Sequence, residues 1–496
     1  MTATPPPDAA ARAESALRSR RFIALLAMAA ILGVPITLAA WGFLRLTNSM
    51  QTWVYTNLPH GVGFHTAPVW WPILPLLVAG LAVGATVKYL PGTGGHVPAD
   101  GLRPSGVVAG ILLPGIAIAA IVSIGLGAVV GPEAPLIALG GGVAVWVVRL
   151  VKRDLPAQAA AVLATAGTFA AVSTLLGSPL VGAFLIIEIA GLAGAVATAV
   201  LVPGLLGAGI GALVFTGIGA LTGQGTFALS IPDLPTAARP TFAEFGWSFV
   251  IGLAAAAVSW LIRRGAAAIR PTVERWTIAA TAGVGLAVAG LAIAYVEGTN
   301  HSNADVLFSG QNELPTLLEH ASTYSIGALL LLVACKGLAY SGSLVAFRGG
   351  PTFPGMFIGA AGGIAMSHLP GLPLVPAVAM GIGAMTVAML RLPFTAVLLT
   401  TLFIGGDGVT VMPLVIVAVV VAHVMTIRLT PIPAQADDQR AEAIDREGET
   451  AGAATVDSPG TDGGATAAGT STGATTQQTN RTQASTAQDH ERDQPG

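Results

Sequence analysis

Long apolar stretches alternate with short breaks rich in polar residues, glycine or proline from about residue 22 to residue 430. A helix needs about 20 apolar residues to cross the hydrocarbon of a bilayer. Runs of this kind begin near residues 22, 68, 106, 134, 157, 180, 195, 245, 276, 325, 356, 374 and 412. Glycine or proline cuts several of them short. The pattern therefore predicts an all-α polytopic membrane protein in which some helices are broken.

Both ends of the chain differ from this apolar region. Residues 1–21 are polar, and Arg18, Arg20 and Arg21 precede the first apolar run. This favours a cytoplasmic N-terminus over a cleaved or twin-arginine signal. Residues 434–496 contain no aromatic residue and are rich in small and polar ones, which predicts a disordered tail. The predicted domains are a segment over 1–21, a membrane domain over 22–430 and a tail over 434–496.

Composition narrows the functional classes. The chain is 53% hydrophobic and only 10% charged, whereas a soluble domain is about a quarter charged. With a net charge of -2 and no long basic block, we expect no nucleic-acid partner. Cys335 is the single cysteine, and neither the histidines nor the carboxylates have metal-ligand or hydrolase spacing. We therefore expect no metal, no cofactor and no enzymatic activity.

Two pairs of segments suggest an internal repeat. The stretch GPEAPLIALGGG from Gly131 matches GPTFPGMFIGAAGG from Gly350, 219 positions later. The stretch SPLVGAFLIIE around Pro179 matches LPFTAVLLTTL around Pro393, 214 positions later. The order is kept, which predicts two copies of one unit over about 22–220 and 243–430. The pattern alone leaves open whether the copies are inverted or parallel.

Each GPxxP segment is typical of a helix start. Proline suits the first helical turn, and the first amides of a helix have no internal partner and attract anions. Because proline has no N–H, the donors must come from its neighbours. We therefore predict a site for a small, weakly hydrated anion where the two starts converge. The predicted donors are the amides of Gly131, Glu133 and Ala134 in one half and of Gly350, Thr352 and Phe353 in the other.

Glu133 is the acidic residue of the first segment, and a carboxylate at bilayer depth costs about 2.5–3.5 kcal/mol even on the mildest scale. A carboxylate at its own helix start can occupy the anion site as a tethered competitor and vacate it when protonated or displaced. The predicted role is a gate. The alternative is a simple helix cap.

Four segments resemble the CLC family of chloride channels and proton/chloride exchangers, in family order between about Phe22 and Arg428. They are GPEAP with Glu133, RGGPTFP over Arg348–Pro354, PGTGGHVP over Pro91–Pro98, and GSPLVGAFLIIE over Gly177–Glu188. The resemblance implies an inverted repeat of two helical halves with broken or re-entrant helices. It also implies chloride transport, gating by Glu133 and a multi-pass homodimer in the cell membrane with one pore in each subunit.

The chain departs from the family pattern in its inner half. Gly95 stands where an anion-coordinating serine is usual, so Gly94 and Gly95 become anion-binding candidates through their amides. Ile189 stands where exchangers carry an inner glutamate; the preceding Glu188 is a candidate proton relay, although one helical step turns a side chain by about 100°. The last tyrosine, Tyr340, is far upstream of the usual pore tyrosine.

These departures indicate a wider inner half, where Ile432 or Pro433 would lie near the constriction. They favour anion passage that is uncoupled or loosely coupled to protons. An obligate proton/chloride exchanger is the close alternative. A membrane scaffold that recruits partners through its tail, and a cation-coupled transporter, are further alternatives, the last being the poorest fit.

Five of the cationic side chains lie inside or beside the apolar runs, and we assign them no role in transport. We expect Lys336, Arg348, Arg149, Lys152 and Arg153 at helix ends near the lipid headgroups. Anion funnelling by these groups is the weaker alternative.

Overall fold

The computed structural model describes residues 18–103, 107–152, 154–191, 194–222 and 236–430. Within these ranges the regular secondary structure is helical, apart from one isolated β-bridge. The predicted tail over 434–496, almost all of the predicted N-terminal segment and most of the connection between the halves lie outside the described residues. The helices within these ranges belong to one unit of the chain, which ends at Pro431.

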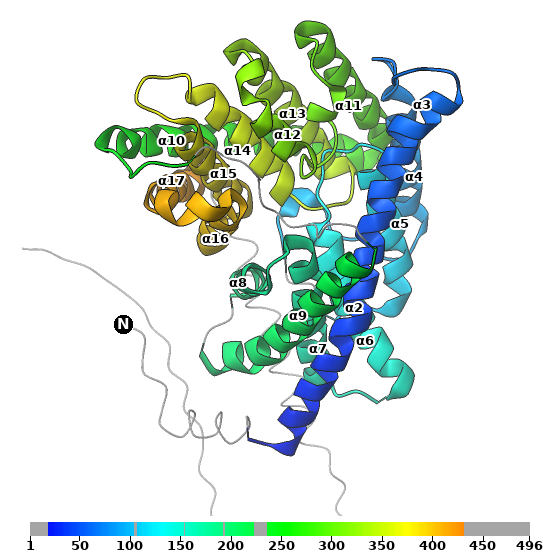
Figure 1. Cartoon of the computed structure of the whole chain (residues 1–496). Coiled ribbons are helices and arrows are strands. Elements are labelled where there is room, and N and C mark those ends of the chain that lie inside the picture. The colour runs from blue at the N-terminus through cyan, green and yellow to red at the C-terminus, as the bar shows by residue number, and fades with distance from the viewer. Residues whose placement is uncertain (1–17, 104–106, 153, 192–193, 223–235, 431–496) are drawn as a thin grey trace, which may run out of the picture. The chain divides into compact units, whose positions relative to one another are not determined.

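The helices follow each other in two successive sets (Figure 1). The first set is α2 (Arg20–Thr52), α3 (Leu58–Gly61), α4 (Ile73–Tyr89), α5 (Leu113–Gly125), α6 (Glu133–Val151), α7 (Ala157–Leu176), α8 (Pro179–Ala190) and α9 (Gly194–Thr222). The second set is α10 (Phe242–Arg275), α11 (Thr277–Thr299), α12 (Glu313–Glu319), α13 (Ile326–Ala346), α14 (Thr352–Met366), α15 (Leu374–Leu390), α16 (Pro393–Ile404) and α17 (Gly408–Leu429). Short 3-10 or π turns link some of them.

Glycine and proline end and restart the apolar helices. Helix α7 ends at Gly177, whose φ of 64° lies in the left-handed region that glycine tolerates. Pro179 then starts α8, where Ser178 Oγ accepts the Val181 amide at 3.4 Å. The helix stops after 12 residues at Gly191, again left-handed with a φ of 59°. Twelve residues span only about 18 Å, so α8 is too short to cross a bilayer.

Among the described residues, eight stretches of helix are long and apolar enough to cross a membrane. They are Phe22–Gly61, Glu133–Val151, Ala157–Leu176, Val200–Leu221, Phe242–Arg275, Thr277–Thr299, Ile326–Ala346 and Pro393–Leu429. The apolar helices α4, α5, α8, α14 and α15 are shorter. Helices α14 and α15 are nevertheless buried over almost their whole length, so they lie inside the protein, where a broken helix keeps its end groups away from lipid.

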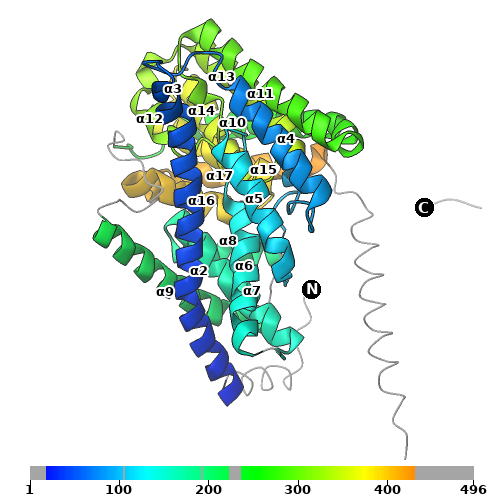
Figure 2. The same cartoon turned by 90° about the vertical axis from the view of Figure 1, so that its right-hand side faces the viewer.

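The two sets of helices pack in the same way. Helix α6 packs on α7 as α14 packs on α15, and α9 contacts α2 and α7 as α17 contacts α10 and α15. Two equivalent pairs meet across the halves, α4 with α11 and α8 with α16. The first set is blue to green and the second green to orange in Figures 1 and 2. The predicted all-α membrane fold of two helical halves is confirmed.

Lys336 contradicts the expectation that it lies near the headgroups. It sits within α13 and is completely buried. Its Nζ donates to the carbonyl oxygens of Asp305 at 2.8 Å, Val306 at 3.2 Å and Leu307 at 3.0 Å. Nζ also lies 4.2 Å from the centroid of the Phe357 ring, which adds a cation–π contact. These acceptors make burial of the ammonium group possible, and the lysine in turn holds the 305–307 segment.

Replacing Lys336 with Met should lower the thermal unfolding midpoint of the detergent-solubilised protein by several degrees. Three buried carbonyl groups would lose their donor, and one such group left unsatisfied costs about 1–3 kcal/mol. The matched control is Lys88→Met, at an exposed lysine in the last turn of α4, which should leave the midpoint unchanged. Circular dichroism measures the midpoints. Equal midpoints for Lys336→Met and the unmodified protein would refute this stabilising role.

Candidate anion site

The two GPxxP segments lie against each other. Gly131 N donates to Gly350 O at 2.8 Å, and Gly350 N donates to Gly131 O at 2.6 Å. This pair forms an antiparallel bridge between equivalent positions of the two halves. The prolines that follow adopt nearly the same φ, -85° at Pro132 and -92° at Pro351. Both act as N-caps, so α6 and α14 begin one residue after proline and their first turns meet in the protein interior.

The predicted donors fall into two groups. The amides of Gly131 and Gly350 bond to each other, so in this arrangement neither is open to an anion. The amides of the first helical turns have no partner within their own helix. These remaining amides belong to Glu133 and Ala134 on α6 and to Thr352 and Phe353 on α14.

The Glu133 side chain occupies the space between the two helix starts. It is 1% exposed, and its Oε1 accepts a hydrogen bond from Thr352 N across the junction of the halves. The amide of Phe353 lies within electrostatic reach of the same carboxyl group. Oε2 is buried with no hydrogen-bond partner, as is the nearby Thr352 Oγ1. The carboxyl group thus occupies the position predicted for an anion, with one oxygen bonded and the other without a partner.

Glycine on both sides leaves room for the carboxyl group in this position. A Cβ at Gly131 or at Gly350 would overlap the Glu133 carboxyl group. Both residues are also held by the reciprocal hydrogen bonds, which leaves the backbone little room to move away. The first glycine of each GPxxP segment therefore serves a close approach of backbone to carboxylate.

Two buried serines that the sequence reading missed hold the segments on which the site is built. Val129 N donates to Ser343 Oγ at 3.2 Å, and Arg348 N donates to Ser123 Oγ at 3.0 Å. Each serine belongs to one half and binds the extended segment of the other. Ser123 and Ser343 are 220 positions apart, almost the offset of the repeat, which is the signal that could have found them.

A cavity of about 410 Å³ adjoins the start of α6. Gly94, Gly95 and Ala134, three of the predicted anion-binding residues, lie in its wall together with Arg348. The backbone is left-handed at four successive positions, Gly92 to Gly95, with φ between 49° and 95°. Gly95 N donates to Gly92 O at 2.8 Å. Of the two loop amides predicted to bind an anion, only that of Gly94 therefore has no hydrogen-bond partner among the described residues.

Arg348 also lies away from the predicted headgroup position. It is 7% exposed, in the short link between α13 and α14, directly before the glycines of the second segment. The prediction of a position near the headgroups is therefore wrong for both Arg348 and Lys336. Both side chains lie inside the protein, where backbone carbonyl groups accept hydrogen bonds from them.

Glu188 lies at the end of α8 and faces the start of α16. Its Oε1 accepts from Phe394 N at 3.0 Å, and its Oε2 accepts from Thr395 N at 2.8 Å and Thr395 Oγ1 at 2.6 Å. The carboxylate therefore caps the equivalent helix of the other half. This arrangement satisfies both of its oxygens.

Tyr340 lies beside the candidate anion site. Its hydroxyl donates to Pro351 O at 2.7 Å, at the N-cap of α14. It is fully buried on α13 and so fixes the start of α14. Ile432 and Pro433, which we expect near the inner constriction, lie outside the described residues.

Residues 100–426, about two-thirds of the chain, match the sequence profile of the family described as "Voltage gated chloride channel". Among curated relatives, "Putative ion-transport protein YfeO" of Escherichia fergusonii is 27% identical over 364 residues, covering 72% of this chain and 82% of the relative. The protein of the same description from Salmonella schwarzengrund is 25% identical, covering 75% of this chain and 88% of the relative.

Solved structures share the fold. A slow cyanobacterial Cl⁻/H⁺ antiporter superposes with a TM-score of 0.66 at 19% identity, covering 82% of this chain and 95% of its own. A CLC-type fluoride/proton antiporter superposes with a TM-score of 0.62 at 18% identity, covering 83% of this chain and 98% of its own. The CLC-like arrangement of two inverted helical halves, expected from the resemblance, is confirmed.

Replacing Glu188 with Ala should destabilise the protein by about 1 kcal/mol, because the start of α16 loses its cap. Thermal unfolding in detergent measures this change. Glu297→Ala, which removes an exposed carboxylate near the end of α11, is the matched control and should have no effect. If the two variants unfold at the same temperature, the capping role of Glu188 is wrong.

Proposed function

We propose that this chain, which belongs to the voltage-gated chloride channel family, carries chloride or a similar small anion through a site formed by the starts of α6 and α14, with Glu133 as the gate. Membrane anion transport follows from the family. The identity of the gate and the way in which passage is coupled are our proposal.

The contrast between Glu133 and Glu188 carries the proposal for the gate. Three donors bond the two oxygens of Glu188. Glu133 accepts one hydrogen bond, and its second oxygen is buried without a partner. An unsatisfied buried carboxylate oxygen is costly, so a permanent cap would be expected to bond both oxygens. The Glu133 carboxylate is therefore suited to leave its position in favour of an anion.

Helix starts supply the attraction for the anion. The first amides of α6 and α14 point into the junction, and the positive ends of two helix dipoles meet there. Water is excluded by the buried surroundings, which strengthens such interactions. A chloride ion at the position of the Glu133 carboxylate would accept from the amides of Thr352 and Phe353.

The residues of the inner half favour anion passage that is uncoupled or only loosely coupled to proton movement. Ile189 offers no titratable group, and the bonds to α16 occupy both oxygens of Glu188. A carboxylate held by three donors is poorly placed to pick up and pass on a proton. Proton relay by Glu188 therefore requires that the cap on α16 first open.

Obligate proton/chloride exchange is the second candidate. The solved structures of similar fold include proteins described as Cl⁻/H⁺ and fluoride/proton antiporters. In that case protons would be a second substrate and Glu188 or water would relay them. We also propose a homodimer in the cell membrane, by analogy with the family.

Replacing Glu133 with Ala should make chloride flux into proteoliposomes independent of external pH. In the unmodified protein, flux should rise several-fold as the pH falls, because a protonated side chain has no charge with which to compete for the helix starts. Glu297→Ala is the control and should keep the pH dependence of the unmodified protein. Unchanged pH dependence in Glu133→Ala would remove Glu133 from the gating role.

Chloride efflux and external pH recorded together should show chloride movement with little or no accompanying proton movement. This is expected because no inner glutamate follows Glu188. Proton uptake driven uphill by a chloride gradient would contradict uncoupled passage and establish exchange, with Glu188→Gln as the next variant. Absence of flux for any small anion would favour the scaffold alternative.

A further inference from the structure

The cavity of about 410 Å³ next to the anion site is lined by cationic side chains. Arg103, Arg348 and His96 contribute to its wall, and no lining residue is acidic. Burial, together with the charge of nearby Arg103, lowers the pKa of His96, so its imidazole is neutral at pH 7. The fixed positive charges of the cavity therefore belong to the two arginines.

Arg348 is held in place without a counter-charge. Its Nε donates to Thr93 O at 3.2 Å, and its Nη1 donates to Phe347 O at 3.1 Å and Val345 O at 3.4 Å. All three acceptors are backbone carbonyl oxygens. Among the described residues, Nη2 has no hydrogen-bond partner and no carboxylate forms an ion pair with this arginine. Carbonyl groups orient the guanidinium but leave its net charge in place.

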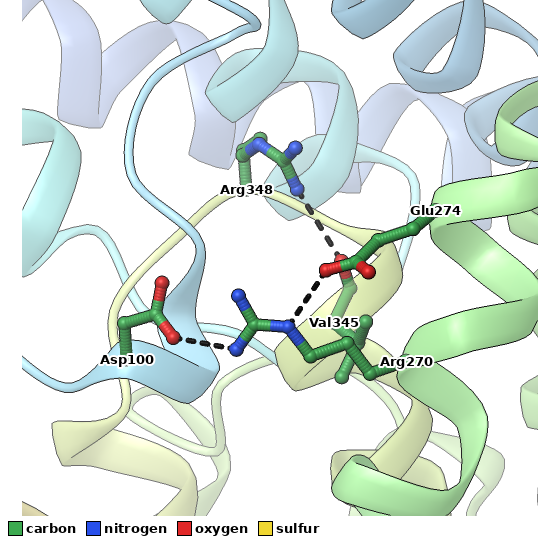
Figure 3. A network of polar contacts seen from close by, with 5 residues as sticks. All are labelled: Asp100, Arg270, Glu274, Val345 and Arg348. Carbon is green, nitrogen blue, oxygen red and sulfur yellow. Dashed lines mark hydrogen bonds and ion pairs between the residues drawn. The ribbon is translucent and has the colours of Figure 1, made fainter. Parts of the chain in front are cut away.

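The carboxylate of Asp100, which lies near Arg348, forms its ion pair with another arginine. Asp100 lies within electrostatic reach of both Arg348 and His96. Instead of turning to them it pairs with Arg270, whose Nη1 is 2.6 Å from Asp100 Oδ1. The other side of Arg270 bonds Glu274 at 2.8 Å (Figure 3). Helix α10 thus supplies the cation that pairs with Asp100.

We propose that Arg348 is an anion-binding side chain of this cavity, which takes a small monovalent anion such as chloride through Nη2 before the amides of Thr352 and Phe353 receive it. The Arg270–Asp100 pair keeps Asp100 from neutralising that charge. Gly95, which lines the same cavity, has no side-chain donor, so Arg348 supplies one there. The inference rests on the proposed anion transport and names the side chain that draws the anion to the site.

The first test measures initial chloride flux in proteoliposomes against chloride concentration. Arg348→Gln should raise the half-saturating concentration at least about fivefold, because a buried unpaired charge is lost, while the maximal rate changes less. Arg348→Lys should restore most of the affinity. Arg264→Gln removes an exposed arginine from the same helix as Arg270 and should have no effect.

A second set of variants leaves Arg348 itself intact. Arg270→Gln releases Asp100, which should then pair with Arg348 and raise the half-saturating concentration in the same direction. The double variant Arg270→Gln with Asp100→Asn should return it to the value of the unmodified protein. A merely structural role for Arg348 does not predict this rescue. An unchanged half-saturating concentration in both Arg348→Gln and Arg270→Gln would overturn the inference.

Chloride binding separates this inference from the proposed function. Isothermal titration calorimetry is performed on the detergent-solubilised Glu133→Ala variant, with and without Arg348→Gln. Binding that Arg348→Gln weakens, in a protein that shows no flux, would reject transport and keep the anion site. Flux together with binding that does not depend on Arg348 would reject the site and keep transport. Absence of both would reject both.

Discussion

The reciprocal hydrogen bonds between Gly131 and Gly350 are the constraint on which the site depends. Deep in a membrane domain every backbone polar group needs a partner, and irregular backbone is tolerated only where it is buried in protein or lines a cavity. By bonding to each other, the two glycines satisfy the last amides before the helices. The next amides, at the starts of α6 and α14, are consequently held at one point and face the same space. Paired irregular segments thus bring the free amides of two helix starts together, and the proposed anion site at these starts rests on this arrangement.

The repeat is symmetric in its backbone and asymmetric in its charges. Glu133 on α6 bonds the start of α14, and Glu188 on α8 bonds the start of α16. By the repeat offsets, their counterparts in the second half are Thr352 and Leu402, so no carboxylate returns the contact. Of two equivalent interactions, one is complete and the other leaves an oxygen unsatisfied. The same architecture therefore holds one carboxylate with both oxygens bonded and one with a single oxygen bonded, and the second is the group that we propose as the gate.

Much of the fold was predictable because the signals were local. Apolar run lengths gave the helices, and two GPxxP segments gave two helix starts within one residue of their position. The pairing of Gly131 with Gly350 was not predictable, since spacing does not say which segments face each other. Lys336 and Arg348 were misplaced for a related reason. A cation in an apolar run is assigned to the headgroups by default, whereas here loop carbonyl groups distant in sequence accept from Lys336 inside the protein.

The way these cations are held bears on what the interior can attract. Lys336 lies within electrostatic reach of the carboxylates of Glu313 and Asp305. Arg348 differs, because its acceptors are backbone carbonyl oxygens, which fix the guanidinium and leave its field largely intact. Asp100, a carboxylate within electrostatic reach of Arg348, is engaged by Arg270. Glu133 then becomes the negative group that meets this positive field at the helix starts. Because Asp100 is engaged elsewhere, the field of Arg348 stays available at this place to one anionic group at a time, which in the proposed function is either the tethered carboxylate or a passing anion.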